Sequence, residues 1–291
     1  MPRVSIILPV YNRAATVGRA IASVVAQTEH DWELIIVDDG SHDDLSGAIA
    51  AVLDHRVHLL RHERNRGAAA ARNSGIRAAR APFIAFIDSD DEWLPTKLER
   101  QIEAIERSQP PLGALCTAFR LRRTRTGYTE DRYPRADGSW AASFLDGCFV
   151  SPGSTLLARR ECFEAVGMLD EALERFEDWD WLLRLVERYR FDCLPEVLAV
   201  VHVGKPPEAA IIDRASRDLE ARHAARIRST AGAKGLRRFR ASLALERVNA
   251  GLGSGRRSAA AMALMQAAVQ SPRRTFAFLS RGLARFKAAD F

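Results

Sequence analysis

Short hydrophobic runs recur along the first 120 residues of the chain, with the length and composition of β-strands. They cover residues 4–10, 34–37, 57–60 and 83–87. Polar or turn-forming residues bound each run, so the pattern predicts four strands.

Helical patterns separate these runs. Apolar side chains recur at helical spacing over 16–27 and 68–79, and Pro95 opens a helix that continues to about residue 107. Ser41, Asp43 and Asp44 are suitable caps for a further helix to about residue 53. Strands that alternate with helices pair in parallel through right-handed crossovers, so we expect a doubly wound α/β sheet.

The pattern changes after residue 120. The stretch RLRRTRTGYTEDR predicts an exposed loop or hairpin. Helices are predicted over about 161–166 and 179–189, and a last strand over 197–203. From about residue 207 the pattern is helical, with breaks near Gly232 and at 251–255.

The balance of charge also changes near residue 205, where the helical C-terminal part begins. Residues 205–291 carry 18 Lys/Arg and 6 Asp/Glu, whereas residues 1–204 carry 25 Lys/Arg and 31 Asp/Glu. The acidic first part argues against nucleic acid as its ligand, so we expect no nucleic-acid partner there. The basic second part suits an anionic partner, either a membrane surface or nucleic acid.

Cysteine use and hydropathy indicate a cytoplasmic protein. The four cysteines have no CxxC spacing, which favours reduced thiols over disulfides or a zinc site. The first hydrophobic run is interrupted by Pro9 and is typical of a strand, not of a secretion signal. No run of 18 or more apolar residues predicts a membrane-spanning helix.

Polar residues follow three of the predicted strands. They are Tyr11-Asn12-Arg13, Asp38-Asp39-Gly40-Ser41 and Asp88-Ser89-Asp90. In a doubly wound sheet these strand ends meet at one edge, where ligands bind. No GxGxxG or GxxxxGK[ST] sequence follows any of the strands, so the usual dinucleotide and P-loop fingerprints are missing.

The segment IDSDDEW places four carboxylates within five positions after a buried strand. Asp88 and Asp90 alternate where the strand ends, so both could reach one Mg²⁺ or Mn²⁺ ion whose shell is completed by substrate phosphates. Helix capping and turn formation before Pro95 is the alternative, although one aspartate would be enough for that.

Three other groups of polar residues are compatible with a structural or a functional role. Asp38 and Asp39 fit a plain turn, or a contact to a base or ribose beside Tyr11. Glu177 and Asp178 lie beside tryptophans, where Asp178 is either an N-cap or a general base. His202 is a core histidine or a metal ligand.

Together these segments resemble glycosyltransferase family 2, whose members are nucleotide-sugar enzymes with a GT-A type fold. The resemblance extends over residues 3–204 and rests on segments in the expected order: SIILPVYNR, ELIIVDDGS, NRGAAAARNSGI, FIAFIDSDDEW, GSTLLARRECFEAVGMLDEAL, FEDWDWLLRL and His202. It implies a catalytic domain at 1–206, with a Rossmann-like nucleotide-sugar half at about 1–110 and an acceptor half at about 111–206. Residues 207–291 would form a basic helical extension.

The resemblance also implies roles for individual residues. The reaction would be an inverting transfer that depends on Mg²⁺ or Mn²⁺, with Asp178 as catalytic base and Asp90 and His202 on the metal. The substrate-binding residues would be Pro9, Tyr11, Asn12, Asp39, Arg72, Asp88, Ser89, Ser154 and Glu177. A UDP-sugar is the favoured donor, and a saccharide or lipid-linked acceptor in polysaccharide synthesis is the expected partner.

Other functions stay open at the level of sequence. One is a different Mg²⁺-dependent α/β phosphoryl-transfer enzyme, and another is a non-catalytic adaptor that binds nucleotide. The apolar residues of the last helix, Phe276 and Phe278 among them, could lie on the inner face of a membrane. Packing against the catalytic domain or a second subunit is the alternative for this face.

Overall fold

The protein is described by a computed structural model that covers residues 1–45, 47, 49, 54–204 and 207–287. It forms two compact units. The first comprises Met1–Arg135 and Cys148–Gly204, and the second comprises Ala136–Gly147 and Lys205–Phe291. Residues 136–147, which we expected in the acceptor half, therefore group with the C-terminal helices.

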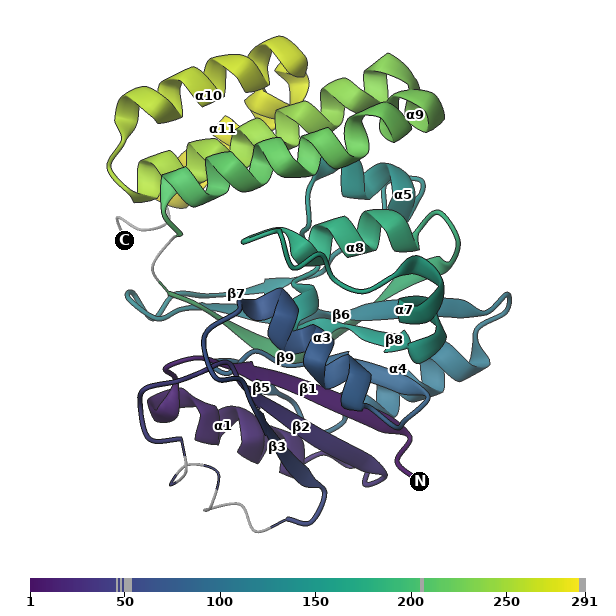
Figure 1. Ribbon diagram of the computed structural model, residues 1–291. Helices are drawn as coiled ribbons and strands as arrows, with labels where there is room; N and C mark the ends of the chain where they lie inside the picture. The colour runs from purple at the N-terminus through teal and green to yellow at the C-terminus, as the bar shows by residue number, and fades with distance from the viewer. Residues whose placement is uncertain (46, 48, 50–53, 205–206, 288–291) are drawn as a thin grey trace. The chain divides into compact units, whose positions relative to one another are not determined.

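The first unit is built on one mixed sheet (Figure 1). Its strands are β1 (Val4–Val10), β2 (Trp32–Asp38), β3 (Val57–Arg61), β4 (Phe83–Phe86), β5 (Glu92–Trp93), β6 (Leu112–Arg123), β7 (Thr129–Arg132), β8 (Leu157–Arg159) and β9 (Arg190–Val203). They lie in the order β3-β2-β1-β4-β8-β6-β9-β5, with β7 paired to β6. Pairing is parallel across β3-β2-β1-β4 and between β6 and β9, and antiparallel elsewhere.

Helices cover both faces of the parallel strands, as Figure 1 shows for α1 and α3. The helices of this unit are α1 (Ala14–Val25), α3 (Ala68–Ala78), α4 (Lys97–Arg107), α6 (Pro152–Thr155), α7 (Arg160–Val166) and α8 (Glu177–Leu185). Ile6 and Leu8 of β1 belong to one buried cluster with residues of α1 and α4. Ile7 points to the other face, where the α-carbon of Gly75 on α3 approaches it so closely that a β-carbon would lie 2.5 Å from Ile7 Cγ2.

The parallel register brings the predicted polar strand ends to one edge. Val10 pairs with Asp38, so Tyr11 and Asp39 leave neighbouring strands side by side. Ile7 pairs with Phe86 on the other side, which places Asp88 at the same edge. The convergence predicted from the alternating pattern is confirmed.

The second unit is helical. It contains α5 (Trp140–Ser143), the 3-10 helix η1 (Phe144–Asp146), α9 (Ala209–Gly253), α10 (Arg257–Gln270) and α11 (Pro272–Lys287). Gly232 interrupts α9 with φ 67° and ψ −173°, at one of the predicted breaks. Ala244, Leu245 and Ala267 form the centre of a small apolar cluster between α9 and α10. Within the described residues, none of the helices combines the length and hydropathy needed to cross a membrane.

Most predicted elements of the first unit are present with ends shifted by one to three residues. The hairpin expected near 120–132 is formed by β6 and β7. The helix expected to end near residue 53 falls largely outside the described residues. β6 begins at Leu112, upstream of the part of the chain where we expected a loop or hairpin.

Candidate active site

Arg72 joins two acidic segments that are far apart in the sequence. Its Nη1 donates to Glu177 Oε1 at 2.7 Å, and its Nη2 donates to Asp88 Oδ1 at 2.7 Å. The side chain is only 7% exposed. Burial opposes its charge, but the carboxylates of Asp88, Glu177 and Asp178 raise the pKa of Arg72 above its usual value. The guanidinium therefore stays charged and fixes the end of β4 relative to the start of α8.

Gly153 makes room for this ion-pair cluster. A β-carbon at this position would lie 2.5 Å from Asp88 Oδ2 and 3.1 Å from Arg72 Nη2. Ser151, two positions earlier, has a left-handed backbone with φ 49°, and this turns the chain into the short helix α6. The backbone of α6 thus lies directly against the carboxylate of Asp88.

Ser154 and Asp91 hold the loop after β4 in place. Ser154 Oγ accepts a hydrogen bond from the Asp88 N–H at 3.0 Å and donates to Asp91 Oδ2 at 2.5 Å. Asp91 Oδ1 accepts from the His202 backbone N–H at 2.7 Å. Asp91 thereby connects the acidic loop to β9, and Ser154 is buried in the same network. A contact of Ser154 with substrate stays a prediction.

Asp90 lies between groups of opposite charge. Burial and the neighbouring charge of Asp88 raise its pKa, whereas Arg13 and His202 lower it. Its backbone carbonyl accepts from Arg19 Nη2 at 2.6 Å, so the loop carrying Asp90 is also tied to α1. The carboxylate is half-buried and acidic neighbours disfavour its charge, which is the environment in which a cation would be stabilised.

His202 has a buried ring whose two nitrogens have no hydrogen-bond partner among the described residues. Its Nε2 lies 3.5 Å from Glu92 Oε1, and its Nδ1 lies 3.9 Å from Asp91 Oδ1. Burial lowers its pKa, and Arg19 and Arg122 act in the same direction. A neutral imidazole with an unused nitrogen is the form that binds metal ions.

The described residues contain no group of three or more His, Cys, Asp or Glu side chains that could hold a metal by themselves. The donor set still fits Mg²⁺ or Mn²⁺, because these ions are commonly held by one or two protein ligands together with phosphate oxygens and water. Asp90 and the unused ring nitrogen of His202 are the two ligands that this arrangement offers.

Asp178 lies in the first turn of α8, next to the Arg72 cluster. Burial and the charge of Glu177 raise its pKa to about 6, while Arg72 and Arg175 act against this shift. Its Oδ1 accepts from the Trp179 N–H at 2.7 Å. Half-buried and with a pKa close to neutral, the carboxylate can take up a proton in the pH range where enzymes work.

Helix α8 is anchored at its other end. Arg184 forms an ion pair with Asp180 at 2.7 Å and donates to the backbone carbonyls of Val166 and Met168 at 2.6 and 2.9 Å. The Trp181 ring stacks on Phe163 of α7 with centroids 4.4 Å apart. These contacts fix the helix whose first turn carries Glu177 and Asp178.

The ends of β1 and β2 form a second polar group. Tyr11 is exposed, and Asn12 has a left-handed backbone with φ 52°. Asn12 Oδ1 accepts from the His42 N–H at 2.9 Å, and the Asn12 N–H donates to Ser41 Oγ at 3.0 Å. Pro9 lies half-buried in β1 opposite Val37. The exposed Tyr11 ring is thus presented on a fixed turn.

The carboxylate of Asp39 is occupied by the protein itself. Asp39 Oδ2 accepts from the Gly67 N–H at 2.8 Å, and Oδ1 accepts from the Arg66 N–H at 3.0 Å. His62 Nδ1 lies 2.6 Å from Asp39 Oδ1, and its Nε2 lies 2.9 Å from Ser74 Oγ. Asp39 therefore shapes the loop before α3, and a contact of this residue with a base stays a prediction.

The structure brings Arg72, Asp88, Glu177 and Asp178 together, and it places Asp90 near His202. Ser89 is buried in the same loop. Sequence reasoning did not assign roles to Asp91, Arg19 and His62, which hold the acidic loop and the Asp39 turn. Asp91 belongs to the acidic run and could have been noticed there, but nothing in the sequence indicates the partner of His62.

Comparison with known proteins identifies the family. The family described as "Glycosyl transferase family 2" matches residues 5–161, which is more than half of the chain. The chain belongs to this family. The matched region contains Arg72 and the whole acidic segment from Asp88 to Glu92.

Two curated relatives illustrate the similarity in sequence. The chain is 46% identical over 99 residues to the UDP-Glc:alpha-D-GlcNAc-diphosphoundecaprenol beta-1,3-glucosyltransferase WfgD of Escherichia coli, covering 34% of this chain and 39% of WfgD. It is 31% identical over 188 residues to an uncharacterised glycosyltransferase of Haemophilus influenzae, covering 64% of this chain and 63% of that protein. The matched regions thus span only part of each relative.

Two solved structures share the fold. The 1–349 part of Staphylococcus aureus TarS, in complex with UDP-GlcNAc, has a TM-score of 0.67 at 17% identity, with 95% of this chain and 83% of that TarS chain covered. The mannosyltransferase PcManGT of Pyrobaculum calidifontis, in complex with GDP-Man and Mn²⁺, has a TM-score of 0.61 at 22% identity, with 97% and 80% covered. The expected GT-A type α/β fold with a helical C-terminal part is confirmed.

Proposed function

We propose that the protein is an inverting glycosyltransferase that moves a sugar from a nucleoside-diphosphate sugar to an acceptor hydroxyl. Family membership supports the class of reaction. A UDP-sugar is the favoured donor, because WfgD uses UDP-Glc and TarS binds UDP-GlcNAc. GDP-sugars are the alternative to be tested, since PcManGT binds GDP-Man.

One observation carries the proposal: Arg72 bonds to Asp88 and Glu177 at 2.7 Å each, which brings Asp178 beside the acidic loop. In this arrangement the proposed proton acceptor on α8 lies near the ion-pair cluster that holds Asp88. Such fixed geometry between a base and a leaving group is what a single displacement requires.

Asp178 is the proposed general base. Its carboxylate would take the proton from the acceptor hydroxyl while the hydroxyl oxygen forms a bond to the anomeric carbon. The bond from that carbon to the diphosphate oxygen breaks on the opposite face, so the anomeric configuration is inverted. Arg72 would orient Glu177 and Asp88 and hold positive charge near the developing negative charge.

Asp90 and His202 are the proposed ligands of Mg²⁺ or Mn²⁺. The bound ion would neutralise the diphosphate as it leaves. Tyr11 would pack against the nucleotide base, with Pro9 and Asn12 shaping that side of the pocket. Asp88 and Ser89 would lie near the ribose, and Ser154 would support the acceptor side indirectly through the Asp88 loop.

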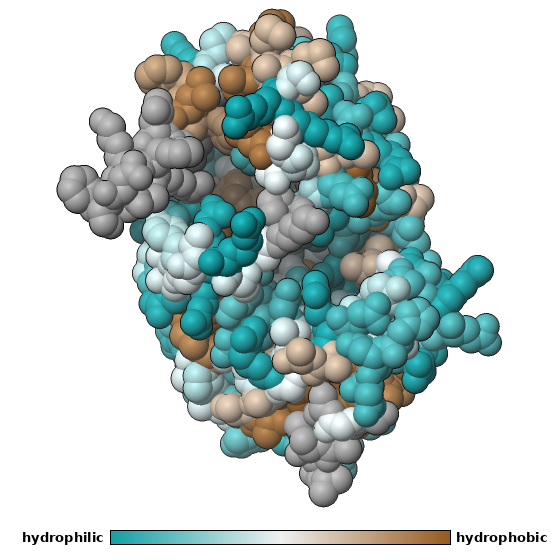
Figure 2. Space-filling model, turned by 90° about the vertical axis from the view of Figure 1, so that its left-hand side faces the viewer, coloured by the Kyte–Doolittle hydropathy of each residue, from teal (hydrophilic) through white to brown (hydrophobic). Residues whose placement is uncertain are grey.

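The acceptor is proposed to be a saccharide, free or linked to a lipid, in polysaccharide or glycoconjugate synthesis. This follows from the lipid-linked acceptor in the name of WfgD. The site of action would be the cytoplasmic side of a membrane, with peripheral contact through the basic C-terminal helices. Figure 2 shows one face of the protein, on which hydrophobic patches lie among hydrophilic residues.

The Asp178→Asn variant tests the proposal. We expect transfer to fall by at least about 10³-fold, as removal of a positioned base does, while UDP binding stays within about twofold of the wild type. Glu164→Gln, on the exposed side of α7, is the matched control and should leave both quantities unchanged. Wild-type turnover in Asp178→Asn would overturn the assignment of the base.

A donor panel tests the reaction class independently. UDP-, GDP- and dTDP-sugars are incubated with Mn²⁺ and a lipid-linked or free saccharide acceptor, and both transfer and donor hydrolysis are measured. Transfer that depends on the acceptor supports the proposal. Phosphate release from simple phosphomonoesters without sugar transfer would instead favour a phosphoryl-transfer enzyme.

A further inference from the structure

The second unit contains a cavity of about 670 Å³ that the proposed reaction does not use. Five of its lining residues are basic: Lys234, Arg237, Arg238, Arg273 and Arg274. Two are acidic, Asp137 and Asp146. The volume lies within the range of small-molecule sites, which is about 300–1,000 Å³. The lining has a clear excess of positive charge.

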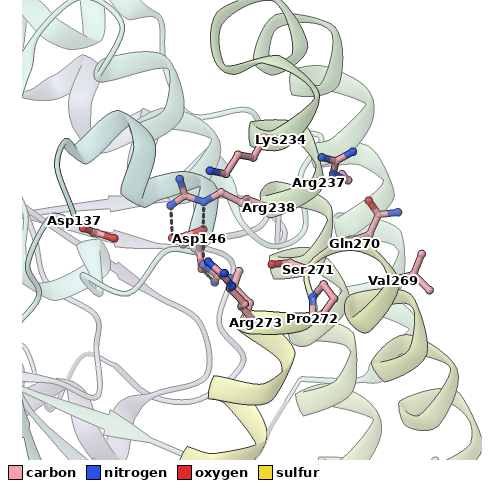
Figure 3. A pocket seen from close by; sticks show the side chains of 11 residues that line it. Asp137, Asp146, Lys234, Arg237, Arg238, Val269, Gln270, Ser271, Pro272 and Arg273 are labelled. Carbon is pink, nitrogen blue, oxygen red and sulfur yellow. Dashed lines mark hydrogen bonds and ion pairs between the residues drawn. The ribbon is translucent and has the colours of Figure 1, made fainter.

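One wall of the cavity is fixed by ion pairs. Asp146 accepts from Arg238 Nη2 at 2.6 Å and also forms an ion pair with Arg274. Arg274 donates in addition to the backbone carbonyl of Asp146. Figure 3 shows Arg238 and Lys234, both on α9, directed toward Asp146. Because Asp146 holds two arginines, their guanidinium groups are oriented before any ligand arrives.

Three cations remain on the rest of the lining. Lys234, Arg237 and Arg273 are exposed, and no carboxylate in the described part of the chain forms an ion pair with them. Like charges this close repel each other, which an anion in the cavity would relieve. Asp146 is already shared by two arginines, so it cannot compensate all five cations.

Helix α11 contributes to the same cavity. Pro272, its first residue, and Arg273 and Arg274 of its first turn are all lining residues. The helix has 16 residues, and its first backbone N–H groups have no intrahelical acceptor. These groups and the positive end of the helix dipole favour a phosphate oxygen.

We propose that this cavity is a binding site for a phosphate or diphosphate group. The cavity is surrounded by several arginines, a lysine and a helix N-terminus. This set of donors suits a tetrahedral, multiply charged phosphate ligand better than it suits a ligand with a single carboxylate. The group can come from a free anion in solution or from the headgroup of a phospholipid. The site lies within the helical unit and is distinct from the residues proposed to bind the donor diphosphate.

Titration calorimetry with inorganic pyrophosphate in EDTA tests the site. EDTA removes divalent metal, which limits binding through the catalytic residues. We expect the K234Q/R237Q/R273Q variant to bind pyrophosphate about tenfold or more weakly than the wild type. The matched control is R228Q/R256Q/R257Q, which removes the same charge from exposed positions of the same unit outside the cavity and should stay within about threefold.

Asp137→Asn gives an opposite test, because it removes an acid from the lining and should tighten pyrophosphate binding. Co-sedimentation with vesicles of phosphatidylcholine containing phosphatidic acid is the second arm, with the same variants. Binding of pyrophosphate alone identifies a free anion as the ligand, and loss of vesicle binding only in the cavity variant identifies a headgroup. Equal weakening by both triple variants, or binding of neither probe by the wild type, would overturn the proposal.

Discussion

The pKa of Asp178 determines how the rate of the proposed transfer depends on pH. Burial and Glu177 raise this pKa to about 6. A base must be deprotonated, so we expect kcat/KM to fall about tenfold per pH unit below pH 6 and to level off above it. Rates measured from pH 4.5 to 8 with a saturating metal would check this. A value of kcat/KM that stays constant down to pH 4.5 would mean that Asp178 does not control the rate.

The same shift has a consequence for stability. The folded pKa of Asp178 exceeds that of an unfolded aspartate, so the folded state binds this proton more tightly and stability falls as pH rises from about 4 to 6. Above pH 6 the cost of the buried charge is fully present. Asp178→Asn removes it, and we expect a gain of the order of 1–3 kcal/mol in unfolding free energy at pH 7.5. Urea unfolding at pH 7.5 and pH 4 should show that the gain shrinks in acid.

Gly153 has to be a glycine, because a side chain at this position would collide with the Arg72 and Asp88 ion pair. In Gly153→Ala the new methyl group would displace Asp88 or Arg72, so we expect at least about tenfold lower activity with a folded protein. Gly18→Ala on α1 is the control, because no atom lies within 4 Å of the position that its methyl group would take. It should keep full activity and gain about 0.5–1 kcal/mol. Full activity in Gly153→Ala would show that the cluster adapts.

At the scale of elements, α8 depends on Arg184. Replacing this residue by Met removes the ion pair with Asp180 and the hydrogen bonds to the carbonyls of Val166 and Met168, so we expect a loss of about 3–5 kcal/mol. Arg188→Met, which removes one exposed hydrogen bond to Ala165, should cost less than about 1 kcal/mol. Thermal and urea unfolding of the two variants give the comparison. Equal losses would mean that Arg184 does not anchor the helix.

Regular hydrophobic alternation made the first elements predictable. β1 occupies Val4–Val10, as predicted, and α3 ends at Ala78, one residue before the predicted end. β6 was harder to predict because its last four residues, RLRR, have the composition of a loop and follow eight buried residues. β8 has three residues, too few for a periodic signal. Sheet order beyond β4 depends on pairing between distant segments, which local patterns do not encode.

The candidate site was predictable where polar residues follow strands. The sequence predicts Asp88, Asp90 and Tyr11 as site residues because they follow buried runs. For Asp178 the residues alone leave an N-cap or a general base open, and its predicted role as base rests on the family resemblance. The role of Arg72 as a bridge between residues 88 and 177 depends on tertiary packing. The engagement of Asp39 by backbone N–H groups could not be foreseen either, since any loop can supply such donors.

At the scale of the whole molecule, the proposed donor carries a negatively charged diphosphate, and the first part of the chain is acidic. Residues 1–204 carry more acidic than basic side chains, so a divalent cation is expected to be essential for transfer. Removal of metal with EDTA should abolish activity, and Mn²⁺ should restore it. Asp88 and Asp91 are held by hydrogen bonds within the protein. We therefore expect EDTA to change the melting temperature of the nucleotide-free protein by less than about 2 °C. Activity that survives EDTA would exclude a metal-dependent transfer.

The helical unit is discontinuous in sequence, and this limits how the protein can be divided. Phe144 and Leu145 are fully or almost fully buried, and the Leu145 carbonyl accepts from Ser242 of α9. A fragment cut at residue 204 would keep these two side chains but lose the helix that covers them. A chimera that exchanges the helical unit between relatives would therefore have to include residues 136–147 together with the C-terminal helices, because a single junction at residue 204 would uncover the apolar side chains of Phe144 and Leu145.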